Sequence, residues 1–252
     1  MSADRMPEGL PPASALPSAG SSAADAETAA RRALRVQMLA TEHWSLLATR
    51  SMSWNEAFAR AGMFLSLLSG AVVALALVAQ ADDFGQGFVT FALLVLPVVL
   101  FVGLATYVRL LEINNEDYVW VRGMNRLRGA YVEMEPSIRP YFMSGVSEKP
   151  VDIFRTYGST EEELQRTDWF HGFVTTPSTI GFVDAMIAAA LGAIVVVQLG
   201  MAMIPAALVG VVVFFVATAA LGYYGFRNQA MAHIAVEATD EARSSVAERA
   251  KE

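Results

Sequence analysis

Residues 61–81 read AGMFLSLLSGAVVALALVAQA and contain no charged side chain. Asp82 and Asp83 follow, and residues 84–108 then give 25 more uncharged residues, FGQGFVTFALLVLPVVLFVGLATYV. A helix of about 20 residues spans the ~30 Å hydrocarbon core of a bilayer. Each run is therefore long enough to cross a membrane, and the pair predicts a transmembrane hairpin whose tip carries the two aspartates.

A second apolar block lies in the last third of the chain. It holds 42 consecutive uncharged residues, 185–226, which is too many for one span. Gly200 is suited to a helix end and Pro205 to the first turn of the next helix, so the block divides naturally between them. We therefore predict two more spanning helices, near 178–198 and 204–226.

The distribution of charge supports four spans. The chain has 252 residues, of which 54% are hydrophobic, and it carries 18 basic and 25 acidic side chains. Within 61–108 and 179–226 the charged residues are only Asp82, Asp83 and Asp184. The other charges lie outside these blocks at the density of a soluble surface. The predicted fold is therefore all-α, with four transmembrane helices in two hairpins and a helical cytoplasmic module.

Changes in composition set the expected segments. The first 24 residues are rich in Pro, Ala, Ser and Gly and cannot bury a core, so we expect them to be disordered. The segments that we expect are a disordered tail (1–24), a cytoplasmic amphipathic helix (25–60), transmembrane hairpin 1 (61–108), a cytoplasmic helical module (109–178), transmembrane hairpin 2 (179–226) and a cytoplasmic C-terminal helix or tail (227–252).

The basic residues predict the orientation, because Lys and Arg concentrate in cytoplasmic loops. The N-terminal segment carries six, the segment 109–179 carries eight, the C-terminal tail carries four, and the two hairpin tips carry none. Both termini and the central module are therefore expected in the cytoplasm. Arginine outnumbers lysine 16 to 2, which fits a GC-rich bacterial genome, so the predicted location is the bacterial inner membrane.

Several classes of function are excluded or left without candidates. The chain has no cysteine, which excludes disulfides, thiolate metal sites and cysteine nucleophiles, and its net charge of −7 gives no electrostatic footprint for nucleic acid. It has no Gly-x-Ser-x-Gly, Walker loop, dinucleotide fingerprint or His-Glu-x-x-His, so we predict no enzyme and no cofactor. Two pairs have metal-ligand spacing but lack further ligands, so no metal site is predicted: Glu112 with Glu116, and Asp168 with His171.

Asp184 is the only acidic or basic side chain inside a predicted span. A carboxylate at membrane depth is costly and is a functional candidate by default. One explanation is an interfacial role near the cytoplasmic end, where water, headgroups and the helix dipole stabilise the charge. The other is an ion-contacting role in a pore or gate.

Small residues recur four apart on one face of the first span, at Gly62, Ser66 and Gly70. Such spacing lets helix backbones approach closely, either inside one bundle or between subunits. We favour packing inside the bundle. The third span repeats the spacing with three alanines: Ala185, Ala189 and Ala193.

The cytoplasmic segments also read as helical. The basic, amphipathic segment 25–60 either lies on anionic headgroups or packs against the central module. The second span is expected to continue as a helix past residue 109 until Pro136 and Pro140 end it. A second short helix is expected to begin at Thr160, which forms a capping box with Glu163.

Polar residues on the extended helix are the candidates for specificity. Asn114 and Asn125 lie on a mostly apolar stripe and are expected to set pairing between helices, as a buried asparagine does in coiled coils. Arg122, Arg126 and Arg128 are candidates for contact with an anionic ligand or a partner. Alternatively, the arginines pair with acidic residues of the same segment: Glu133, Glu135 and residues 161–163.

Three stretches carry a family resemblance: TEHWSLLATRSMSWNEAF (41–58), EINNED (112–117) and GMNRLR (123–128). They resemble a family of four-span integral membrane proteins of GC-rich bacteria that have no assigned function. The likeness extends over most of residues 35–230. It implies no ligand, activity or site residue.

Together these observations predict a multi-pass membrane protein that acts as a non-enzymatic oligomeric scaffold or interaction protein through its cytoplasmic helices. The expected partners are membrane lipid, further copies of the chain and a cytosolic protein. The alternative is a passive channel or small-solute transporter. In that case polar residues of the spans would line the path: Thr90, Thr106, Asp184, Gln198 and Thr218.

Overall fold

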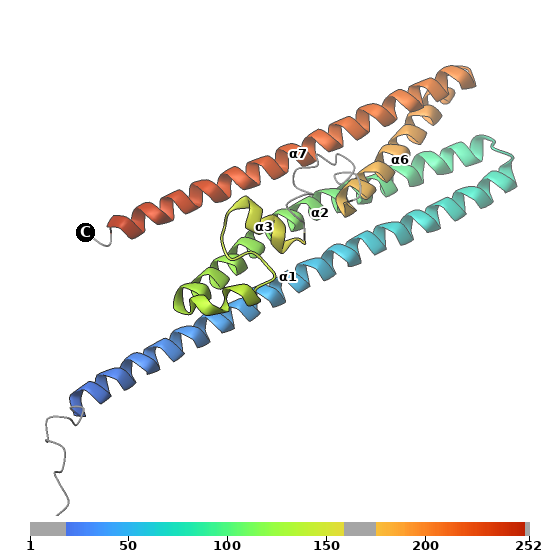
Figure 1. The fold of residues 1–252 in the computed structure, drawn as a ribbon. Coiled ribbons are helices and arrows are strands. Elements are labelled where there is room, and N and C mark those ends of the chain that lie inside the picture. Colours follow the sequence, from blue (N-terminus) through green and yellow to red (C-terminus); the bar gives the residue numbers. More distant parts are fainter. Residues whose placement is uncertain (1–18, 159–174, 250–252) are drawn as a thin grey trace, which may run out of the picture. The chain divides into compact units, whose positions relative to one another are not determined.

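The structure, a computed structural model, describes residues 19–158 and 175–249, and the described residues form helices and no strand (Figure 1). Four helices are long and apolar enough to cross a membrane, as predicted. The elements are α1 (Ala19–Asp82), α2 (Gln86–Met134), the 3-10 helix η2 (Pro136–Tyr141), α3 (Pro150–Thr156), α6 (Thr176–Gln198) and α7 (Met203–Arg249).

Two tight turns close the predicted hairpins. Between α1 and α2, Asp83 and Phe84 take positive φ angles of 44° and 58°. The Asp82 carboxylate accepts a hydrogen bond from the backbone N–H of Phe88 at 2.8 Å and so satisfies one free donor at the start of α2. Between α6 and α7, Gly200 has a φ of +87°, a conformation that favours glycine, and Pro205 lies in the first turn of α7.

The helices extend well beyond the spans. α1 has 64 residues and α2 has 49, so the cytoplasmic helix expected at 25–60 is continuous with the first span. α1 begins at Ala19, inside the segment 1–24 that was expected to be a disordered tail. α2 ends at Met134, directly before the prolines that were expected to end it.

The chain divides into two compact units at Ser45 and Leu46, and the packing described below lies within the second, Leu46–Glu252. There α6 packs closely against both α7 and α2. A Cβ added at Gly192 would lie 3.2 Å from the side chain of Val213, and one at Gly210 would lie 3.2 Å from the carbonyl oxygen of Ala189 and 3.4 Å from Ala193. Small residues of the third span therefore pack inside the bundle, as favoured from the sequence.

Two expectations lie outside the described residues. They are the short helix with the Thr160 and Glu163 capping box, and the pair Asp168 and His171.

Candidate functional site

The Asp184 carboxyl group is buried among the spans. The residue lies two turns into α6 and is only 1% exposed. Neither carboxyl oxygen has a hydrogen-bond partner among the described residues. A carboxyl group normally keeps such a position only with a partner or without its charge, because desolvating an isolated charge is very costly.

The carboxyl group occupies a space that a glycine of α2 leaves open. A Cβ added at Gly103 would lie 1.8 Å from Oδ1 of Asp184 and 2.8 Å from the ring of Phe64. Phe64 belongs to α1 and is fully buried. We call Phe64, Gly103 and Asp184, one residue from each of three helices, the Asp184 seat.

The seat corrects one explanation of Asp184. An interfacial role requires water or headgroups at the carboxyl group, and the side chain is too deeply buried for either. A dipole role is also wrong, because the effect of a helix N-terminus falls off within the first turn and Asp184 lies beyond it.

The polar residues expected to line a path do not share one surface. Thr90 and Gln198 are exposed, whereas Thr106 is buried and donates its hydroxyl to the Val102 carbonyl at 2.8 Å. Thr218 is half-buried, and its hydroxyl has no partner among the described residues.

A buried ion pair joins α1 and α2 in the module that was expected in the cytoplasm. Asp117 is 1% exposed and accepts two hydrogen bonds from Arg50. Nε of Arg50 donates to Oδ1 at 2.6 Å, and Nη2 donates to Oδ2 at 3.2 Å. Trp54 donates its indole N–H to Oδ1 at 3.0 Å. We call Arg50, Trp54 and Asp117 the junction lock.

Tyr157 lies beside the junction lock, with its ring centre 5.7 Å from the guanidinium carbon of Arg50. Burial raises the pKa of Tyr157, and the nearby Asp117 carboxylate raises it further.

A second ionic network lies directly at the end of the span. Arg109 contacts both carboxylate oxygens of Glu56 on α1, at 3.0 and 3.1 Å, and also Glu112 at 3.1 Å and Glu116 at 3.0 Å. Hydrogen bonds from Arg109 and then Arg60 lower the pKa of Glu56 to about 2, and the same carboxylates raise the pKa of Arg109. Glu112 and Glu116, which have metal-ligand spacing in the sequence, are therefore both paired with Arg109.

Both networks bear on the alternatives for segment 25–60. The part of this segment in the second unit, residues 46–60, packs against α2 through Arg50 and Glu56. Contact of segment 25–60 with anionic headgroups stays a prediction.

Asn125 holds the α3 segment onto α2. It is fully buried; its amide donates to the carbonyls of Ser147 at 3.1 Å and Asp152 at 3.3 Å. Its oxygen accepts from Arg128 and from the hydroxyl of Thr156, each at 2.8 Å. The side chain thus orders a loop, whereas the sequence suggested pairing between long helices.

Asn114 is half-buried on α2. The neighbouring Asn115 makes the link between helices, donating to the Asn228 side chain of α7 at 3.1 Å. The sequence pattern therefore indicated the correct region of α2, but Asn115 and not Asn114 makes this contact with α7.

The candidate arginines contact groups of this chain. Arg122 and Arg126 both pair with Glu148, with Nη2 of Arg122 at 2.8 Å, and Arg128 donates to Asn125. Hydrogen bonding from Arg126 lowers the pKa of Glu148 despite partial burial, and burial lowers the pKa of Arg128. The anionic contact observed for Arg122 and Arg126 is thus Glu148, which was not singled out from the sequence.

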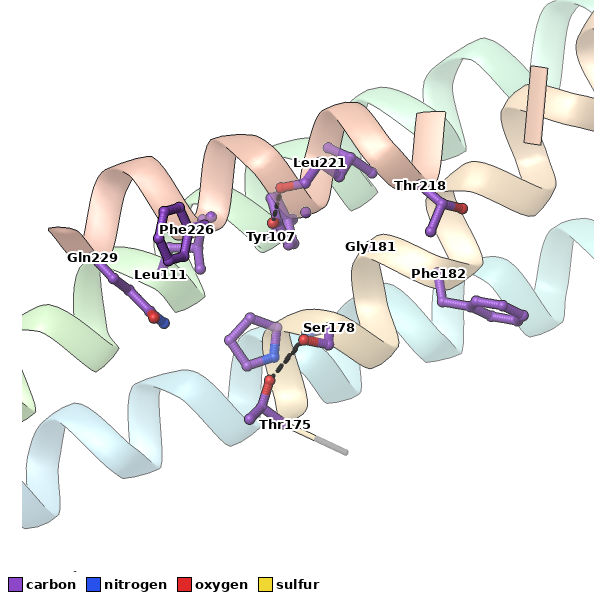
Figure 2. A pocket seen from close by; sticks show the side chains of 13 residues that line it. Tyr107, Leu111, Thr175, Ser178, Gly181, Phe182, Thr218, Leu221, Phe226 and Gln229 are labelled. Carbon is purple, nitrogen blue, oxygen red and sulfur yellow. Dashed lines mark hydrogen bonds between the residues drawn. The ribbon is translucent and has the colours of Figure 1, made fainter. Parts of the chain in front are cut away.

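A cavity of ≈ 360 Å³ lies between α2, α6 and α7 (Figure 2). The Tyr107 hydroxyl crosses it to donate to the Leu221 carbonyl at 2.6 Å, and a Cβ at Gly181 or Gly225 would meet the Tyr107 side chain at 3.0 or 2.8 Å. The walls of the cavity are mostly apolar, and hydroxyl groups such as that of Ser178 lie at one side. This lining suits an uncharged, mostly apolar ligand.

The stripe of Gly62, Ser66 and Gly70 is exposed. A Cβ added at either glycine would meet nothing within 4 Å. The favoured packing inside the bundle is therefore wrong for this stripe. The buried face of α1 is formed instead by Phe64 and by alanines: Ala57, Ala61, Ala71 and Ala79.

The described part of the chain contains no group of three or more His, Cys, Asp or Glu side chains that could hold a metal ion. Comparison with protein-family models, curated proteins and solved structures finds no match to this chain. The resemblance drawn from residues 41–58, 112–117 and 123–128 stays a prediction.

Two acidic residues on which the module depends were not singled out from the sequence. Asp117 and Glu148 lie in charged segments where many acidic residues look alike, and their partners are 67 and 22 to 26 positions away. Gly103 was also missed, because nothing in the sequence shows that it lies beside Asp184.

We predict that Asp117→Ala lowers the free energy of unfolding by about 3–5 kcal/mol, because it leaves the Arg50 guanidinium without its partner. The paired replacement of Arg50→Met with Asp117→Leu should recover much of this loss, since no unpaired charge remains. Denaturant unfolding of the three variants in detergent micelles measures the effect. Equal destabilisation by the single and double variants would contradict the prediction.

Proposed function

We propose that this protein is a non-enzymatic homo-oligomeric scaffold of the bacterial inner membrane that works through its cytoplasmic module. The observation that carries the proposal is the exposed stripe of Gly62, Ser66 and Gly70. Close helix association in lipid depends on small residues, and this chain leaves three of them uncovered on its first span.

The stripe is well placed for a second copy. Ser66 follows Phe64 by two residues, about 200° around a helix of 3.6 residues per turn, so the stripe faces away from the bundle. The Ser66 hydroxyl donates to the carbonyl of Gly62 at 2.9 Å, so it needs no partner from lipid. A smooth apolar face without an unsatisfied polar group supports docking of the same face from another copy.

The junction lock supports transmission of this contact to the cytoplasmic module. α1 and α2 both run without a break from the span into the module, and the ion pair of Arg50 with Asp117 holds their extensions together. A contact between spans would therefore fix the spacing and orientation of neighbouring modules.

The module also offers a surface for a cytosolic protein. Apolar side chains on and beside η2 and α3 are exposed, with Tyr141 at 83% and Met143 at 93%. Phe154 and Val151 of α3 are exposed as well. Clustered exposed apolar groups on a water-soluble part indicate an interaction site, so we assign the partner contact to this surface.

The natural absence of cysteine allows a clean test by cross-linking. We predict that Ser66→Cys forms a disulfide-linked dimer in native membranes upon mild oxidation, because symmetric docking places the two sulfurs close together. Val72→Cys is the matched control: residue 72 is 55% exposed but lies about 200° around the helix from Gly70. Equal dimer yields from both positions, or no dimer from either, would contradict the proposal.

A passive channel or small-solute transporter is the second candidate, and the buried carboxyl group of Asp184 is the observation that favours it. Reconstituted vesicles discriminate the two functions. If the protein conducts a solute, Asp184→Asn should change the flux, whereas a scaffold should give the same background flux with either side chain.

A further inference from the structure

We infer that Asp184 is a proton-binding site inside the membrane bundle and that each chain holds one proton there when α6 is packed against α2. This inference goes beyond the proposed scaffold, and it does not depend on oligomer formation. It rests on the geometry of the Asp184 seat.

No counter-charge is observed at the carboxyl group. Neither carboxyl oxygen has a hydrogen-bond partner among the described residues, and the two residues that share the seat with Asp184, Gly103 of α2 and Phe64 of α1, carry no charged or donating side chain. Tyr107, one turn further along α2, is titratable, but its hydroxyl is committed to the Leu221 carbonyl of α7. An ionised carboxylate in this position would have neither water nor a partner, so the neutral acid is the form that fits.

The seat does not suit a metal cation as the occupant. Na⁺, Mg²⁺ and Ca²⁺ need several oxygen ligands around them. The seat offers two oxygens from one carboxyl group against a glycine backbone and an aromatic ring, and a Cβ is already too large for the space beside Oδ1. A proton needs no additional room, because it bonds to one oxygen of the carboxyl group.

The site makes the packing of the bundle sensitive to proton activity. Loss of the proton would leave a bare carboxylate between three helices, and its hydration would require α6 to separate from α2 at Gly103. Because the folded state keeps a proton that the unfolded chain has already released above about pH 4, stability should fall as the pH rises from there.

The decisive experiment labels the full-length protein in micelles with dicyclohexylcarbodiimide. An apolar carbodiimide takes the acid proton onto one nitrogen while the carboxyl oxygen bonds to its central carbon, so it reacts with the protonated acid. Mass mapping at neutral pH should show one adduct, at Asp184, which is absent from Asp184→Asn. The labelling rate should fall about tenfold per pH unit once the carboxyl group ionises.

Asp117 provides an internal control. It is as deeply buried as Asp184 but is paired with Arg50, so it should stay unlabelled. Labelling of Asp117 together with Asp184 would show that burial alone directs the reagent and would overturn the inference. A labelling rate at Asp184 that does not change with pH would do the same.

Thermal unfolding covers the case in which the reagent fails to reach the seat. The melting temperature of the wild type should fall, relative to Asp184→Asn with its neutral amide, as the pH rises above about 4, where an aspartate of the unfolded chain ionises, and should level off once the folded-state carboxyl group has ionised as well. Parallel pH profiles for the two proteins, together with no adduct at Asp184, would overturn the inference.

Gly103→Ala tests the seat itself. Its Cβ would lie 1.8 Å from Oδ1, so the variant should displace the carboxyl group and flatten the pH profile of unfolding. Gly222→Ala is the matched control, because its Cβ meets nothing within 4 Å and should leave the profile unchanged. A wild-type profile in Gly103→Ala would show that the carboxyl group lies elsewhere.

Discussion

The hydrocarbon core of a bilayer offers no water to a polar group, and this constraint organises the whole chain. It explains why two blocks of residues, 61–108 and 179–226, contain so few of the charged side chains. It also explains why polar groups within the spans bond to backbone carbonyls, as Thr106 does to Val102 and Tyr107 to Leu221. Among the described residues, the hydroxyl of Thr218 and the carboxyl group of Asp184 are exceptions. The same constraint implies that the carboxyl group is held without its charge.

Small residues determine how closely the spans can approach. Gly192 and Gly210 let α6 and α7 meet, and Gly103 makes room for Asp184 between three helices. Outside the spans, ion pairs add to close packing. Arg50 with Asp117, and Arg109 with Glu56, join α1 to α2 beyond the apolar block. The same continuous helices are thus held by close packing in the spans and by close packing with ion pairs beyond them.

Much of the fold could be predicted from local patterns. Uncharged runs gave the four spans, Gly200 and Pro205 marked the second turn, and Pro136 marked the end of α2. These signals succeed because they act within one helix or one turn.

The candidate site was less predictable because it depends on which faces meet. The stripe at Gly62 has the same spacing whether it is buried or exposed, and only the position of Phe64 on the opposite face shows that it points outward. Likewise, Asp184 is one carboxylate in a helix until Gly103 is seen beside it. Contacts between distant residues, such as Asp117 with Arg50, leave no local trace in the sequence.

Infrared spectroscopy tests the protonation of Asp184 most directly, because it distinguishes a carboxylic acid from a carboxylate without a reagent. The difference spectrum between the wild type and Asp184→Asn at neutral pH should contain the C=O stretching band of a protonated acid, shifted in D2O. A difference spectrum with only the paired bands of an ionised carboxylate would contradict a neutral Asp184 and the constraint from which it follows.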